Sequence, residues 1–184
     1  MPIPVTTVAD LILARAAQRG QRLSNLKLQK LLYYAQGYHL AATGEPLYDT
    51  PVRAWEHGPV VPDIWHRHRT DIGWLTITPV PEAPAVDGAF AATVEQVLDE
   101  FLGFSAEELR EMSHLDAPWR VTRQSNPGAA SPIIPTELIG GYFRERFRLA
   151  GRHVAEAGGM TAAAIKERAR AIIHRHDALF RRLA

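Results

Sequence analysis

A serine–histidine–aspartate run and eight histidines are the residues of this chain whose chemistry could support catalysis or metal binding. Ser113, His114 and Asp116 stand almost side by side, whereas the members of a catalytic triad must converge in space with distinct roles, which neighbours on one chain seldom do. His66 and His68 are separated by a single residue, and on a helix such a pair points in different directions. Metal-binding helices instead place their ligands at i and i+4. We therefore predict neither a catalytic triad nor a metal site.

The sequence also lacks the short motifs of the common enzyme classes. It contains no cysteine, which excludes disulfides, thiolate nucleophiles and cysteine-bound zinc or iron–sulfur clusters. No GxSxG, HExxH, Walker-type or GxGxxG motif occurs. We predict that the protein is not an enzyme and binds no cofactor.

The composition is that of an ordinary globular protein, with 46% hydrophobic and 22% charged residues in a chain of 184. The first residues have neither the basic start nor the apolar core of a signal peptide. No apolar run reaches the roughly 18–20 residues that span a bilayer. A cytoplasmic protein without a membrane partner is the expectation.

Charge is distributed unevenly, although the formal net charge is only +1. Residues 82–116 carry nine acidic side chains against one arginine, and residues 137–184 carry ten basic side chains against five acidic ones. The two segments could neutralise each other, or they could form an acidic and a basic docking surface. Residues 137–184 contain neither Asn nor Gln, the amides that read base edges, so nucleic acid is not the expected partner.

The elements that position these residues are organised around a central helix over residues 24–44. Ser24 or Asn25 can cap its start, and Gly44 can end it with a positive φ. Apolar side chains recur at helical spacing along most of its circumference, which is typical of a helix at the centre of a domain. One strip of this helix is expected to face solvent and to be available to a partner; it carries Lys27, Lys30 and Tyr34.

Five further helices and one hairpin complete the predicted domain. The helices are expected near residues 8–19, 63–69, 93–103, 105–113 and 136–147. Capping boxes at Thr93 and at Ser105 are expected to start the third and fourth of these. A short strand at Trp55 should lead into a turn at Gly58-Pro59 and pair with residues 72–78, and residues 125–135 should form a loop. The prediction is a mainly α domain of about six helices over residues 1–149, followed by a C-terminal amphipathic helix in residues 150–184.

Several motifs of the chain resemble, in their order, those of the Panacea-domain antitoxins, a family that includes SocA-like and phage-associated proteins. The motifs are Leu26–Gly37, Pro46–Tyr48, Ala54–Pro62 and His114 followed by Pro118-Trp119. The resemblance covers roughly residues 5–149. Ser113 stands where the family has threonine, and residues 150–184 extend past the motifs.

The resemblance implies a small helical antitoxin of a type II-like pair, encoded beside a protein toxin that it neutralises by direct binding. The same domain is paired with many unrelated toxins, so the resemblance predicts the role and not the target. Eleven positions carry the signature, and two of them are Gln29 and Pro118. The other nine are candidate partner-binding residues, although they could instead hold the fold: Lys27, Lys30, Tyr34, Trp55, His57, Gly58, Pro59, His114 and Trp119. Trp55 and Trp119 have the aromatic, partly polar surroundings typical of binding hot spots.

Alternatives to simple neutralisation remain open from the sequence. The SocA-like branch is known for delivering its toxin to an ATP-dependent protease, so an adaptor role would lower the amount of toxin. A DNA-binding autorepressor would bind its own promoter with a steep salt dependence. Residues 150–184 could serve the toxin or the protease, or form a homodimer through the C-terminal helix.

Overall fold

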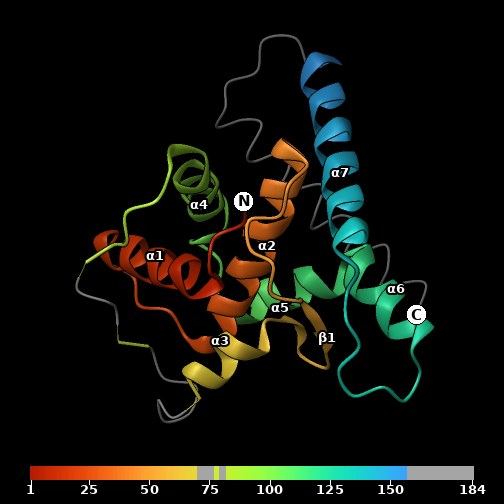
Figure 1. The fold of residues 1–184 in the computed structure, drawn as a ribbon. Coiled ribbons are helices and arrows are strands. Elements are labelled where there is room, and N and C mark those ends of the chain that lie inside the picture. Colours follow the sequence, from red (N-terminus) through yellow and green to blue (C-terminus); the bar gives the residue numbers. More distant parts are fainter. Residues whose placement is uncertain (70–76, 79–81, 157–184) are drawn as a thin grey trace. The chain divides into compact units, whose positions relative to one another are not determined.

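The computed structural model describes residues 1–69, 77–78 and 82–156, with residues 150–156 described by their backbone alone. These residues form seven helices and one two-stranded sheet (Figure 1). In order they are α1 (Val5–Gln18), α2 (Asn25–Thr43), β1 (Arg53–Trp55), β2 (Gly58–Val60), α3 (Pro62–Arg67), α4 (Gly88–Phe101), α5 (Ala106–Leu115), α6 (Ala117–Ser125) and α7 (Thr136–Glu156). The predicted mainly α fold with a small hairpin is confirmed.

Helix α2 is the centre of the fold. It begins after Ser24, whose Oγ accepts a hydrogen bond from the backbone N–H of Lys27 at 3.2 Å, and ends at Gly44, which has a φ of 80°. Both predicted boundaries are confirmed. Helix α2 packs against α1, α3, α4, α5 and β2 (Figure 1), and every residue from Leu28 to Leu40 is buried.

Aromatic side chains fill the space between α2, α4 and the first part of α7. The ring of Tyr34 stacks on that of Phe101 with centroids 4.2 Å apart, and Phe143 meets Tyr33 and Tyr38 edge-on. Phe143 lies so close to Gly37 that a Cβ at that glycine would stand 2.2 Å from the phenyl ring. The absence of a side chain at Gly37 is therefore what lets Phe143 reach the core.

The hairpin differs from its prediction in both its turn and its pairing. Glu56 and His57 form the turn, and Gly58-Pro59 lies in β2 rather than at the turn. The other edge of β1 is also occupied, because the N–H of Ala54 donates to the carbonyl of Pro132 at 2.9 Å. The predicted pairing of β1 with residues 72–78 is therefore wrong; residues 72–76 lie outside the described part of the chain.

Two helices between the hairpin and α7 also depart from the prediction. Helix α4 begins at Gly88, and Thr93 lies inside it with its Oγ donating to the carbonyl of Ala89, so the capping box at Thr93 is wrong. The capping box at Ser105 and Glu108 is confirmed at the start of α5. Helix α6 was not predicted, because Pro118 resembles a helix stop but stands in the first turn.

Part of the acidic segment 82–116 is neutralised by two arginines at the end of α1, Arg15 in its last turn and Arg19 at its C-cap. Glu95 forms ion pairs with Arg15 and Arg19, and Asp99 pairs with Arg19. These contacts join α1 to α4 at the surface, where ion pairs contribute about 0–1 kcal/mol each. The acidic segment is therefore matched in part within the fold, by Arg15 and Arg19.

The chain divides into two compact units, Met1–Arg144 and Glu145–Ala184. The described part of the second unit is the end of α7, in which Arg148 pairs with Glu145. The predicted boundary at residue 149 stays a prediction, and the C-terminal helix lies outside the described residues. None of the helices that the structure describes is long and apolar enough to cross a membrane.

Candidate functional site

Three buried polar side chains of α2 hold the extended segment that comes after this helix. We call Gln29, Lys30 and Gln36 the inner row. Gln29 accepts a hydrogen bond from the N–H of Val61 at 2.9 Å, and Gln36 accepts from the N–H groups of Leu47 and Tyr48 while donating to the carbonyl of Tyr48. Buried backbone groups that lack partners are costly, so the inner row acts as a template for residues 47–61.

Lys30 holds the hairpin on the side that faces α2. Its Nζ donates to the carbonyl of His57 at 2.6 Å and to that of Pro59 at 3.0 Å, and the side chain is fully buried. Burial lowers the pKa of Lys30 to about 7, the Arg110 guanidinium acts in the same direction, and Glu107 partly opposes both. Near neutral pH, this amine is therefore close to losing its charge while its two carbonyl partners remain in place.

Gly58 is the residue that makes room for Lys30. It has a φ of 99°, and a Cβ there would stand 2.6 Å from Lys30 Nζ and 2.8 Å from Ser113 Oγ. Pro59 pairs with Ala54, and its carbonyl faces Lys30. Both signature positions therefore shape the contact between the hairpin and α2.

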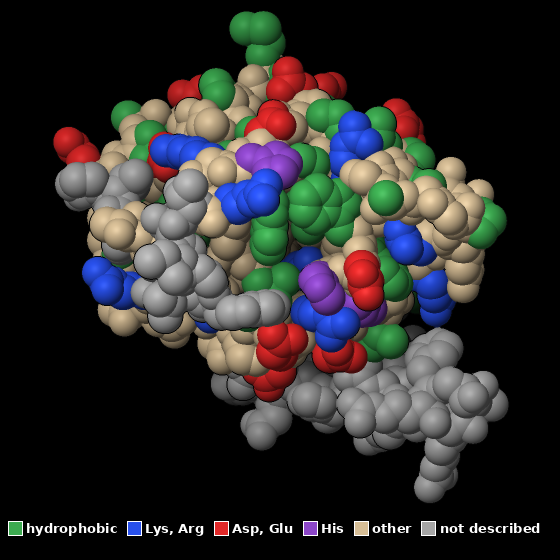
Figure 2. Space-filling view, turned by 90° about the horizontal axis from the view of Figure 1, so that it is seen from below, with side chains coloured by type: hydrophobic (Ala, Val, Ile, Leu, Met, Phe, Trp, Pro, Cys, Tyr) green, Lys and Arg blue, Asp and Glu red, His purple; other side chains and the backbone are tan. Residues whose placement is uncertain are grey.

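The outer side of the hairpin carries half-buried aromatic rings from four elements. Trp55 of β1 meets Trp65 of α3 edge-on at 5.9 Å, and Trp119 of α6 donates from Nε1 to the carbonyl of Trp55 at 2.8 Å. His114 of α5 stacks on Trp119 with centroids 4.1 Å apart. Figure 2, which views the molecule from below relative to Figure 1, shows hydrophobic side chains gathered between histidines and charged side chains.

The electrostatic environment keeps His114 uncharged. Burial lowers its pKa to about 4, the cationic Arg110 and Lys30 act in the same direction, and Glu111 together with a hydrogen bond to the backbone of Glu56 opposes them. A neutral imidazole stacked on an indole is a packing element. Its Nε2 has no hydrogen-bond partner among the described residues.

Seven of the nine candidate partner-binding residues therefore meet around the hairpin, and two do not. Tyr34 is fully buried in the aromatic core. Lys27 is half-buried at the start of α2, where Nζ donates to the carbonyl of Leu102 at 2.8 Å and burial lowers its pKa. The predicted solvated strip of α2 is wrong, because Lys30 and Tyr34 are both fully buried. Only His57 among the nine is exposed.

The residues considered for catalysis do not form a common site. Ser113 Oγ donates to the carbonyl of Arg110, His114 stacks on Trp119, and Asp116 accepts a hydrogen bond from Tyr142 at 2.6 Å. Their side chains are thus directed to three different partners. Within residues 1–69, 77–78 and 82–156, no three histidine or acidic side chains gather as metal ligands.

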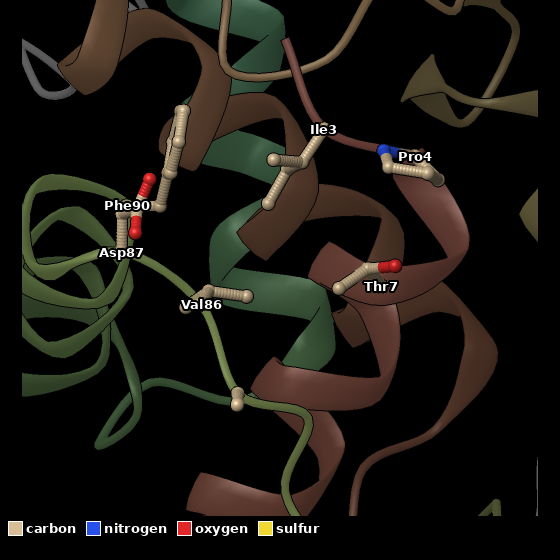
Figure 3. Close-up of a pocket in the computed structure, with 7 residues that line it drawn as sticks. Ile3, Pro4, Thr7, Val86, Asp87 and Phe90 are labelled. Atoms are coloured by element: carbon tan, nitrogen blue, oxygen red, sulfur yellow. The ribbon is translucent and has the colours of Figure 1, made fainter. Parts of the chain in front are cut away.

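A shallow pocket of about 460 Å³ lies away from the hairpin, where the chain start and α1 face the start of α4 (Figure 3). Its lining residues are mostly apolar, and Asp87 is the one charged residue among them: Ile3, Pro4, Thr7, Ala85, Val86, Asp87 and Phe90. It holds no pair of groups suited to acid–base or nucleophilic chemistry. The signature residues lie outside it.

Three residues around the hairpin were not found by sequence reasoning. Arg53 Nη1 donates to the carbonyl of Ser131 at 2.7 Å, Ser131 Oγ accepts from Trp55 Nε1 at 2.7 Å, and Arg123 Nη1 donates to the carbonyl of Ala129 at 2.9 Å. The spacing of Arg53 and Trp55, two residues apart in a strand and so on one face, could have indicated the first. No signal pointed to Ser131 or Arg123, because α6 itself was not predicted.

Comparisons with known proteins agree with this arrangement of motifs. The family model described as "Antitoxin SocA-like, Panacea domain" matches residues 28–78, which include the inner row and the hairpin. The antitoxin SocA of Caulobacter vibrioides is 32% identical over 160 residues, an alignment that covers 79% of this chain and 83% of that protein. No solved structure gives a significant match. This chain therefore belongs to the family of SocA-like antitoxins that carry a Panacea domain.

Proposed function

We propose that this protein is the antitoxin of a type II-like pair, and that it neutralises a protein toxin encoded by the adjacent gene through direct stoichiometric binding in the cytoplasm. The observation that carries the proposal is the 32% identity to a protein named antitoxin SocA along 79% of this chain. The proposal assigns the protein a binding role and no catalytic one.

The outer side of the hairpin supports direct binding as the mode of action. Trp55 and Trp119 are half-buried, so their positions are fixed by packing while part of each ring faces solvent. Tryptophan dominates binding hot spots, because a large rigid ring gains contact area at little cost in side-chain entropy. Lys30, Gly58 and Pro59 lie beneath this surface and support it.

Co-expression with the adjacent gene in a heterologous bacterium tests the proposal. If the neighbouring gene alone arrests growth and this protein restores it, the antitoxin role holds. Restoration should be lost on Trp55→Ala and retained with Gln124→Leu, a change on the exposed side of α6. A harmless neighbour, or arrest that persists with this protein present, would contradict the proposal.

The amount of the toxin in the same experiment separates masking from delivery to an ATP-dependent protease. Masking by binding keeps the level of the toxin, whereas an adaptor makes it collapse when the protease is present. The two mechanisms share the binding step and differ in the fate of the bound toxin. An autorepressor would instead reduce transcription from its own promoter without binding the neighbouring gene product.

A further inference from the structure

The strand β1 and its neighbours form a surface on which positive charge and aromatic rings occur together. We call Arg53, Trp55, Trp119, Arg123 and Ile133 the cationic patch. Arg53 and Trp55 are two residues apart in β1, so their side chains leave the same face of the strand. Ile133 lies directly opposite Arg53 in an antiparallel bridge and is 50% exposed. Directly opposed residues share a face, so Ile133 belongs to the same surface.

The two arginines of the patch retain unused donors. Arg53 uses Nη1 on the carbonyl of Ser131, and Arg123 uses Nη1 on the carbonyls of Ala54 and Ala129. Within the described part of the chain, neither guanidinium has an acidic partner, and their Nε and Nη2 atoms make no hydrogen bond. Four arginines elsewhere in the described residues differ, since each forms an ion pair with a carboxylate: Arg15, Arg19, Arg67 and Arg110.

The tryptophans of the patch present ring surface rather than hydrogen-bond donors. Trp55 Nε1 is bonded to Ser131 Oγ, and Trp119 Nε1 is bonded to the carbonyl of Trp55. His114 already covers one face of the Trp119 ring. A ligand therefore meets apolar ring surface beside two guanidiniums that can each bind a carboxylate.

We propose that the cationic patch binds an acidic segment of the toxin, in which carboxylates pair with Arg53 and Arg123 and an apolar side chain rests on the tryptophans. This inference rests on the proposed function and identifies the part of the partner that is recognised. A guanidinium that already donates from one nitrogen to a carbonyl is held in place, and its remaining fork fits the two oxygens of a carboxylate.

Protein carboxylates fit this surface better than the phosphates of a nucleic acid. Glu56 is exposed at the hairpin turn next to Trp55. A continuous chain of phosphates that followed the hairpin would meet this carboxylate, whereas a short acidic segment need not. The covered face of Trp119 also leaves less room for a base to stack.

Two variants that place opposite charges at the exposed position Ile133 test whether binding depends on charge. The full-length protein carrying Ile133→Asp or Ile133→Lys is titrated with the purified product of the adjacent gene, and the dissociation constant is measured. The aspartate should weaken binding by about tenfold or more, because it repels an acidic segment and satisfies Arg53 internally. The lysine should leave binding unchanged or tighten it. Thermal unfolding of both variants checks that the fold is kept.

Removal of the arginines provides a second test. The double change Arg53→Gln and Arg123→Gln should weaken binding, because it removes the ion pairs between the patch and the acidic segment. Salt screens such ion pairs, so the dependence of binding on salt concentration should also fall. The matched control is Arg22→Gln, which removes one exposed charge from the connection between α1 and α2. This control should bind as the wild type does.

The outcomes separate failure of this inference from failure of the proposed function. If the wild type binds the neighbouring product and both Ile133 variants weaken binding equally, the contact is apolar and the acidic-segment inference is wrong. If neither variant changes binding, the patch is not the interface, although the antitoxin role stands. If the wild type does not bind the neighbouring product, both fail. Binding of a promoter DNA fragment that the aspartate abolishes would assign the patch to nucleic acid and overturn the inference.

Discussion

Lys30 of the inner row and the cationic patch lie on opposite sides of the same short hairpin, and the inner row and the patch use polar side chains in opposite ways. In the inner row, Gln36 makes three hydrogen bonds to buried backbone groups, and Lys30 makes two. In the patch, Arg53 and Arg123 each use a single nitrogen within the described part of the chain. The polar groups on one side are fully engaged by the fold, and those on the other side retain capacity for a partner.

This difference indicates how one sequence signature can serve both stability and recognition. A change in the inner row removes partners from buried backbone, so its cost falls on the free energy of unfolding. A change in the patch removes groups that face solvent, so its cost should fall on binding. Variants on both sides of the hairpin test whether the inner row governs stability and the cationic patch governs binding.

The largest expected effect is the loss of stability in Gln36→Leu. The leucine leaves the N–H groups of Leu47 and Tyr48 and the carbonyl of Tyr48 buried without partners. At about 1–3 kcal/mol for each group, the free energy of unfolding should fall by roughly 3–5 kcal/mol in a urea titration. The control Gln124→Leu changes an exposed side chain and should stay within about 0.5 kcal/mol of the wild type. Equal losses in the two variants would contradict the template role of the inner row.

The next effect concerns the pH dependence of stability that Lys30 contributes. Its pKa is about 7 in the folded protein and 10.5 when unperturbed, so between these values the unfolded chain binds more protons. The free energy of unfolding should therefore rise with pH across this window, by on the order of 2 kcal/mol from about pH 7 to about pH 9, and be level for this group below it. Urea midpoints of wild type and Lys30→Met should differ in this slope.

Lys27→Met is the matched control for this measurement. Lys27 is only half-buried, and burial lowers its pKa in the same direction with Glu108 opposing. Its removal should change the slope less than removal of Lys30 does. If the difference between wild type and Lys30→Met does not vary with pH, Lys30 keeps its proton throughout and the burial argument is wrong.

The burial of Lys30 also shows where prediction from the sequence ends. The helix that carries it was predicted with both ends, because Ser24 and Gly44 are local signals of capping and termination. Lysine is seldom buried, so the pattern assigned Lys30 to solvent. Its partners are the carbonyls of His57 and Pro59, which lie 27 and 29 residues further along the chain. No local sequence pattern predicts such a contact.

Helices α4 and α6 illustrate ambiguity in the local signals themselves. Thr93 and Gln96 have the spacing of a capping box, but the Thr93 hydroxyl donates to the carbonyl of Ala89 inside α4. The helix begins earlier because its first turns are rich in alanine, a strong helix former. Pro118 can stop one helix or begin another, and here it begins α6. Because α6 was not predicted, Arg123 was not identified as a residue near the hairpin. Arg123 carries one of the two positive charges of the cationic patch.

A smaller effect is expected on acidification, through His114. Its pKa is about 4 in the folded protein against an ordinary 6.5, so as pH falls through this window the unfolded chain takes up a proton first. The contribution of His114 to stability is therefore present above pH 6.5 and is lost towards pH 4. The variant His114→Phe keeps an aromatic ring on Trp119 and should lose less stability over this range. An NMR titration of the His114 ring gives the pKa directly, and an ordinary value would contradict the proposed environment.

The smallest expected effect on stability is that of His57→Ala, which separates the backbone of a signature residue from its side chain. Lys30 binds the carbonyl of His57, and the side chain itself is exposed. Alanine keeps the carbonyl, so the free energy of unfolding should stay within about 0.5 kcal/mol of the wild type. Gly58→Ala, one residue further, is the contrasting variant, because its Cβ would displace Lys30 Nζ. A large loss of stability in His57→Ala would mean that the exposed side of the hairpin also holds the fold. Unchanged stability with weaker binding of the neighbouring gene product would instead place His57 in the interface and extend the recognition surface from the cationic patch to the hairpin turn.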